Sequence, residues 1–201
     1  MQITGQSGPQ SVLPGGTAIV RIGGGAELSV SELRSRYYQT TRDGNMFGIT
    51  GGLTTTTAAG AATFTGLIVG NPAGSGYNLV MNKVFVAQGA ALTAETEIGV
   101  MYGINTTTVS LTTIFNRMAN GRASVAVANA GQTITAMTAF YVFAGSGSGA
   151  ITVPGIEPIC GIDFEGSLII PPGYAIASYT SRVTTSALVF TFNWEEVPIT
   201  S

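Results

Sequence analysis

Short β-rich runs recur along the chain from about residue 62 onward. They are rich in Val, Ile, Thr, Phe and Tyr, and Gly, Pro, Asn or Ser residues separate them, as in the strands of sandwiches and barrels. No segment in this region repeats its apolar residues with a helical period. We expect strands over Thr63–Val69, Asn78–Val86, Glu97–Tyr102, Val109–Phe115, Ser124–Ala128, Ala139–Phe143, Ile151–Val153, Gly166–Ile170, Tyr174–Tyr179 and Ala187–Trp194.

The last of these runs has the clearest alternation. Leu188, Phe190, Phe192 and Trp194 share one face under the two-residue period of a strand. Burial of each Leu or Phe contributes roughly 1.5–3 kcal/mol, so we expect this face to lie deep in a core. About eight to ten strands of this kind predict an all-β protein, an antiparallel jelly-roll sandwich.

Residues 1–60 have a different character. They contain glycine pairs and triplets and a run of threonines, and their apolar residues follow no regular period. Only Ser31–Tyr38 has the composition of a short helix, with Ser31 as a candidate N-cap. We therefore predict an extended, mostly irregular N-terminal arm over 1–60 that docks on neighbouring subunits, followed by a jelly-roll domain over 61–201.

The composition changes this picture in the direction of assembly. Hydrophobic residues make up 45% of the 201 residues and charged residues 9%, against roughly 25% charged in an average soluble domain. A neutral surface promotes association, which predicts that other subunits cover much of it. The net charge of −2 argues against direct nucleic-acid binding.

The N-terminus has neither a basic region nor an apolar region of the signal-peptide type, and no run approaches the ~18 apolar residues of a membrane span. We expect synthesis in the cytoplasm and no membrane partner.

Candidate chemistry is sparse. The chain has no histidine and one cysteine, which excludes Ser-His-Asp and Cys-His catalysis, the usual zinc sites and an intrachain disulfide. Asp163 and Glu165 lie two apart and would share a strand face, as a glycosidase pair or a hard-cation site, or as a solvent-facing strand edge. Glu195 and Glu196 are adjacent, so they point to opposite faces and are interpreted as a charged strand end. We expect no enzyme activity, cofactor or metal.

The arm combines basic and aromatic side chains in one short stretch. Arginines and aromatic residues are typical anchors of protein interfaces. The neighbouring Glu32 and Asp43 weaken a nucleic-acid interpretation, so protein docking is favoured, and a disordered tail is the alternative for the arm as a whole. The predicted interface residues are Arg34, Arg36, Tyr37, Tyr38 and Arg42.

The C-terminal two-thirds resembles phage-encoded virion structural proteins with a TNF-like or C1q-like jelly roll. The turn within Gly66–Met81, the Pro-Pro-Gly hairpin within Leu168–Ile176 and the ending Phe192–Glu196 carry this resemblance. It implies a homotrimer that acts as a capsid cement or decoration protein on the major capsid protein of a bacteriophage, at the virion surface. The alternative is a receptor- or glycan-binding head of a fibre or spike, with Tyr77 or Tyr102 at the site, although no repetitive shaft precedes the domain.

Overall fold

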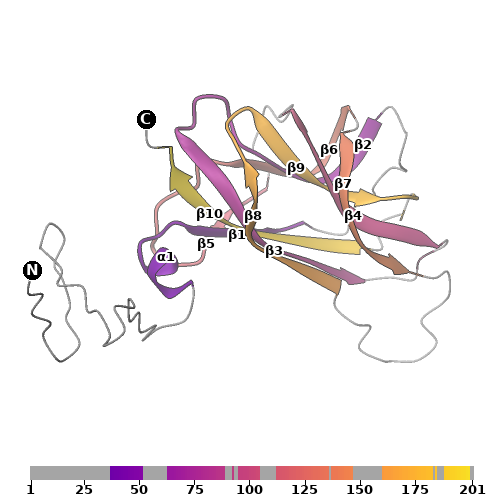
Figure 1. Ribbon diagram of the computed structural model, residues 1–201, viewed down its shortest axis with the longest axis horizontal. Helices are drawn as coiled ribbons and strands as arrows, with labels where there is room; N and C mark the ends of the chain where they lie inside the picture. The colour runs from indigo at the N-terminus through magenta and orange to yellow at the C-terminus, as the bar shows by residue number, and fades with distance from the viewer. Residues whose placement is uncertain are drawn as a thin grey trace, which may run out of the picture. The chain divides into compact units, whose positions relative to one another are not determined.

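The computed structural model describes residues 37–51, 63–88, 92, 95–104, 112–135, 137–146, 160–182, 184 and 188–199. The chain divides into two compact units, Met1–Tyr38 and Gln39–Ser201, and of the first unit the structure describes Tyr37 and Tyr38. The elements of the described residues (Figure 1) are α1 Tyr38–Arg42, β1 Met46–Thr50, β2 Thr63–Gly70, β3 Tyr77–Gln88, β4 Thr96–Ile104, β5 Phe115–Asn116, β6 Val127–Thr135, β7 Thr138–Ser146, β8 Cys160–Ile170, β9 Tyr174–Thr180 and β10 Leu188–Pro198.

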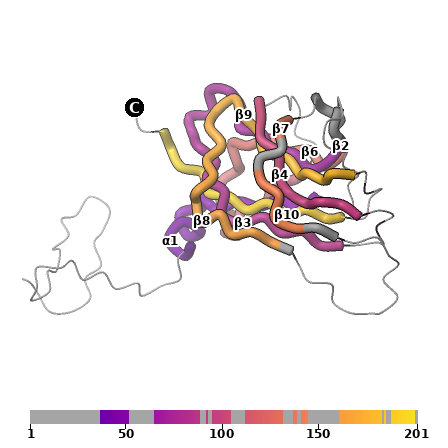
Figure 2. The backbone as a smooth tube through the Cα atoms, turned by 45° about the vertical axis from the view of Figure 1, so that its right-hand side comes forward, coloured from indigo at the N-terminus to yellow at the C-terminus, as the bar shows by residue number. Residues whose placement is uncertain are grey.

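The strands form two five-stranded antiparallel sheets. Sheet I has the order β5-β1-β10-β3-β8, and sheet II has the order β6-β2-β9-β4-β7. Most strands that follow one another in the chain lie in opposite sheets. If the short β5 and the next strand in the chain, β6, are left out, the strand orders of the two sheets are those of a jelly roll. Figure 2 shows the two layers, with β3, β8 and β10 below β2, β6 and β9. The predicted all-β jelly-roll sandwich is confirmed.

The main core lies between the sheets. Leu188, Phe190, Phe192 and Trp194 of β10 are exposed by 1% or less and belong to one buried cluster with residues of both sheets, as their alternation predicted. The Trp194 ring stacks on Phe47 of β1, with centroids 6.2 Å apart. The last strand of the chain is therefore the centre of both sheet I and its core face.

A second buried cluster lies on the other face of sheet II. Ile68, Met101 and Ala177 are each adjacent in sequence to a main-core residue. Because side chains alternate along a strand, these three point away from the main core. Met137, from the connection between β6 and β7, packs against this cluster and lies over Gly103. Met137 thus covers part of the outer face of sheet II, and the outer face of sheet I carries several exposed apolar side chains.

Three differences from the predicted elements concern the N-terminal part and the middle of the chain. Residues 46–50, predicted as part of the arm, form β1 between β5 and β10, so the first described strand of the sandwich begins at Met46 rather than near residue 60. The described helix is α1, later than the predicted Ser31–Tyr38, whose residues 31–36 lie outside the described residues. Of the predicted strand Val109–Phe115, only Phe115 is in a described strand.

Two predicted strands begin at other residues in the structure. Strand β6 begins at Val127 rather than Ser124, because the Val125 amide donates to the Glu196 carboxylate instead of a sheet neighbour. Strand β8 begins at Cys160 rather than Gly166, and a bulge with φ of 48° at Glu165 and 84° at Gly166 interrupts it. The predicted strand Ile151–Val153 lies outside the described residues.

Candidate interaction surface

The outer face of sheet I, called here the sheet I face, is built from side chains that alternate with core residues of the same strands. The strand registers place these residues in three rows across the sheet. Read from the β5 side toward β8, the rows are Thr50, Thr191, Phe85 and Gly161; Phe115, Gly48, Asn193, Lys83 and Asp163; and Met46, Glu195, Val80 and Ile169.

The charged side chains of the sheet I face are bonded to their neighbours. Lys83 Nζ lies 2.9 Å from Asp163 Oδ2, and a hydroxyl of α1 donates to Glu195 Oε1 over 3.2 Å. Arg117 lies across Gly48 and donates to the Asn193 side chain. Exposed ion pairs contribute only ~0–1 kcal/mol to stability, so the main effect of this pairing is a nearly neutral face. Depletion of charge is typical of the central part of protein interfaces.

Exposed apolar side chains lie on the sheet I face and at both of its edges. Phe115 is 60% exposed at the β5 edge, Ile169 is 50% exposed on β8, and Phe85 lies between them on β3. The ring of Phe164 on β8 packs edge-on against Tyr141 on β7, with centroids 5.8 Å apart. The edge strands β7 and β8 therefore lie on the same side of the sandwich, and Tyr141 extends the apolar surface there.

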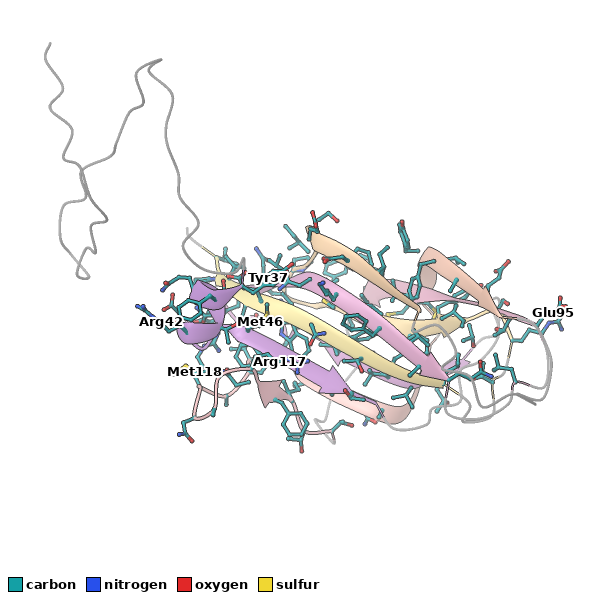
Figure 3. All side chains as sticks on the ribbon, turned by 90° about the horizontal axis from the view of Figure 1, so that it is seen from below. Tyr37, Arg42, Met46, Glu95, Arg117 and Met118 are labelled. Carbon is teal, nitrogen blue, oxygen red and sulfur yellow. The ribbon has the colours of Figure 1, made fainter. Side chains whose placement is uncertain are left out.

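Asn116 organises the segment that follows β5. Its Nδ2 donates to Gly44 O over 2.8 Å and to Arg122 O over 2.9 Å, while its Oδ1 accepts from the Met118 amide over 2.9 Å. The Gly121 amide donates to Met118 O over 3.0 Å and closes a turn. One side chain thus holds the turn against β1, and the turn presents Arg117 and Met118 to solvent (Figure 3).

Glu196 forms a buried polar cluster that was not predicted from the sequence. Its side chain is fully buried. Its carboxylate forms an ion pair with Arg122 Nη1 at 2.6 Å and accepts hydrogen bonds from Ser124 Oγ over 2.5 Å and from the Val125 amide over 3.0 Å. The Arg122 guanidinium also lies 5.0 Å from the centroid of the Phe47 ring. Opposite faces for the two adjacent glutamates are confirmed, but Glu196 is not at a solvent-facing strand end. The inward alternation of β10 continues through Glu196, and this could have predicted its burial.

The pair Asp163 and Glu165 lies on β8, an edge strand, and both residues are exposed, in agreement with a solvent-facing strand edge. The Glu165 amide donates to Asp163 Oδ1 over 3.0 Å, and Lys83 binds the other oxygen of that carboxylate. The bulge breaks the regular alternation on which a shared face depended. Within the described part of the chain, no three Cys, Asp or Glu side chains gather in a way that could hold a metal ion.

Tyr102 and Tyr174 form a stacked pair at one end of sheet II, with centroids 5.3 Å apart and planes 7° apart. Burial raises the pKa of Tyr102 above its usual value of 10.0, and the neighbouring Tyr174 raises it further. Tyr174 remains 39% exposed, so one aromatic surface of the pair is accessible. Tyr77 is different, because the Arg122 guanidinium lies over its ring, 5.0 Å from the centroid.

No family model matches the sequence, and no curated protein or solved structure matches it. The resemblance to phage virion proteins with a TNF-like or C1q-like domain therefore stays a prediction. The helix in the described residues has five residues, and none there is long and apolar enough to cross a membrane.

The predicted arm interface falls mostly at the limit of the described residues. Arg34 and Arg36 lie outside them, Tyr37 precedes α1, and Tyr38 and Arg42 are its first and last residues. Tyr38 and Arg42 are exposed, and Arg42 Nε lies 3.9 Å from a carboxylate oxygen of the next residue in the chain. A docking role for these five residues stays a prediction.

Proposed function

We propose that the protein is a structural virion protein without enzymatic activity, which associates as a homotrimer and stabilises the head of a bacteriophage as a capsid cement or decoration protein. Its partners would be further copies of itself and the major capsid protein, at the capsid surface, with no direct contact to nucleic acid or membrane. The sequence resemblance is the source of the trimer and capsid parts of this proposal.

The observation that carries the self-association is the sheet I face. Lys83 is paired with Asp163, Arg117 donates to the Asn193 side chain, and Phe85, Phe115 and Ile169 are exposed on this face or at its edges. Apolar surface of this kind contributes about 25 cal/mol for each Å² removed from water. Met137 packs against the buried cluster on the outer face of sheet II, so we place the self-association on the sheet I face.

The first experiment measures the mass of the purified protein by light scattering, alone and after mixing with emptied capsids of the phage that encodes it. We expect a trimer that co-sediments with capsids. A monomer, or a trimer that stays in the supernatant, would contradict the proposal.

The arm is tested with a chain that lacks residues 1–36. A deletion of the whole predicted arm, 1–60, is unsuitable because it removes β1, whereas Gln39–Ser201 is a compact unit containing both sheets. We expect the shortened chain to remain a folded trimer and to lose capsid binding. Unchanged capsid binding would mean that the arm has no docking role.

A receptor- or glycan-binding head is the second candidate, favoured by the accessible Tyr102–Tyr174 pair. Stacked aromatic rings offer an apolar face with polar tips, which suits a sugar ring. Binding of the protein to a glycan array, abolished by Tyr174→Ala and retained by Tyr141→Ala, would support this function. Absence of binding to any glycan by the unaltered protein would count against it.

A further inference from the structure

The side chains of Tyr102, Ile104 and Tyr174, called here the tyrosine platform, lie on the face of sheet II that is turned toward the main core. Val100 lies two positions before Tyr102 on β4, Ile176 lies two positions after Tyr174 on β9, and both belong to the main core. Because side chains alternate along a strand, the three platform residues point to that same face. Ile104 and Tyr174 are nevertheless 70% and 39% exposed, so the sandwich is open at this end.

The platform joins an apolar surface to polar tips. Ile104 and Tyr174 are partners in the register of β4 and β9. The Tyr174 ring stacks on Tyr102, with 5.3 Å between the centroids, and Tyr102 packs against the main core. Such rings combine a flat apolar body with a hydroxyl that both donates and accepts hydrogen bonds. This combination matches a sugar ring, which has an apolar face surrounded by hydroxyl groups.

The backbone that carries Tyr174 is held in place by Asn71, the residue after β2. The Asn71 amide donates to Tyr174 O and its carbonyl accepts from the Gly173 amide, both over 2.8 Å. Its fully buried side chain donates through Nδ2 to Tyr77 O over 2.8 Å and to Ile170 O over 2.9 Å. A surface already fixed in one conformation loses less entropy on binding, so this anchoring favours the platform as a binding surface.

The strands that form and flank the platform carry almost no charge. Strands β2 and β9 contain no charged residue, and the one charged residue of β4 is Glu97, seven positions from Ile104. Seven residues of a strand span roughly 23 Å. Arg122, whose guanidinium lies over the Tyr77 ring, is paired with Glu196. A bound carboxylate or phosphate is stabilised mainly by cationic donors, so the platform suits a ligand without charge.

We propose that the tyrosine platform binds a neutral sugar, with the apolar face of one pyranose ring on Tyr174 and the edge of that ring beside Ile104. This inference rests on the second candidate function, the receptor- or glycan-binding head, and names the class of glycan that the head recognises. Sialic acids, uronic acids and phosphorylated sugars carry a negative charge that these strands do not balance. The platform belongs to sheet II, so sugar binding is compatible with self-association through the sheet I face.

The test compares neutral with acidic oligosaccharides by isothermal titration calorimetry. The neutral probes are oligosaccharides of glucose, galactose, N-acetylglucosamine and rhamnose, and the acidic probes are sialyllactose and oligogalacturonate. We expect binding of a neutral probe that Tyr174→Ala weakens by about tenfold or more and that Tyr174→Phe, which keeps the ring, leaves within about threefold. Tyr141→Ala is the matched control, because Tyr141 is also exposed but packs on Phe164 of β8.

A charge placed on the platform tests its selectivity separately. Ile104→Lys puts a cation beside Tyr174, and we expect it to raise the affinity for acidic relative to neutral probes by about threefold or more. Val142→Lys is the control, because Val142 is 48% exposed and pairs with Gly99, five positions from Ile104. An unchanged affinity ratio in Ile104→Lys, or an equal change in both variants, would contradict binding at the platform.

The outcomes separate this inference from the candidate function on which it rests. Thermal unfolding of each variant first establishes that it is folded. Binding of acidic probes alone, or neutral-sugar binding that Tyr174→Ala leaves unchanged, would overturn the platform assignment and leave a glycan-binding head in place. Absence of binding to every glycan would overturn both, and the capsid cement function would then depend on the capsid experiment alone.

Discussion

Glu196 is as inaccessible to water as the phenylalanines that precede it on β10, although it carries a carboxylate. A buried charge is tolerated only when it is paired and its remaining acceptor sites are bonded. Arg122 is paired with Glu196 Oε2, and Ser124 and the Val125 amide donate to Oε1; all three come from the segment between β5 and β6. At the scale of a single residue, Glu196 therefore fixes a segment that has almost no regular secondary structure.

The first prediction concerns this carboxylate. Glu196→Gln removes the charge and leaves Arg122 without its ion pair, which costs about 3–5 kcal/mol in a fully buried pair. Arg122 is 33% exposed and can be partly hydrated, so we expect a loss of about 2–3 kcal/mol in the free energy of unfolding. Urea denaturation measures this loss. The matched change Glu195→Gln is expected to cost less than about 0.5 kcal/mol, and equal losses would contradict a special role for Glu196.

Two tyrosines predict how stability falls at high pH. Burial is the main cause that raises the pKa of Tyr102 and of Tyr179 above 10.0, with smaller contributions from Tyr174 and Glu97 respectively. A raised pKa means that the folded state holds the phenolic proton more tightly, so this stability is fully present below pH 10 and is lost as the pH rises through the folded-state pKa. Tyr102→Phe and Tyr179→Phe should each make the decline in unfolding temperature above pH 10 less steep. Tyr141→Phe is the control, and a decline that neither change alters would contradict the assignment.

At the scale of elements, the turn after β5 depends on close packing between two residues. A Cβ at Gly121 would lie 2.3 Å from Asn116 Cγ, and Asn116 cannot move away without giving up its three hydrogen bonds. Gly121→Ala should therefore lower the unfolding free energy by about 1–3 kcal/mol. Gly131→Ala, where a Cβ meets no atom within 4 Å, should change it by less than about 0.5 kcal/mol. Similar effects of the two substitutions would show that the turn can rearrange.

The strands that the sequence predicted are those whose own residue pattern, or an adjoining turn, indicates a strand. Strand β10 has an unbroken alternation of large apolar residues, and β9 follows a Pro-Pro-Gly turn. Strand β1 was missed because Gly48 interrupts a five-residue run in a glycine-rich region, and pairing with the far end of the chain makes it a strand. The bulge in β8 depends on its pairing with β3, and it interrupts the alternation along β8. For this reason the sequence did not predict the part of β8 that precedes Gly166.

The sequence predicted that the candidate site is an association surface, but not where on the molecule it lies. The low charge content predicted association, and the absence of histidine excluded most catalytic alternatives. The surface itself depends on the registers that bring Phe85, Asn193 and Lys83 from distant segments into neighbouring rows. The packing of Met137 on the outer face of sheet II could not be predicted from the sequence either, because it is a contact between distant segments.

At the scale of the whole molecule, the central position of β10 has a consequence for biosynthesis. The ribosome makes β10 after the other described strands, yet β1 and β3 have no common sheet until β10 lies between them. Sheet I therefore cannot close until β10 has been made, and pairing between distant parts of a chain is slow. A chain that stops at residue 187 should stay open and aggregate, and a peptide of residues 188–198 supplied separately should restore a soluble sandwich. Until β10 has been made, sheet I lacks its central strand, and a strand from another chain could take that place.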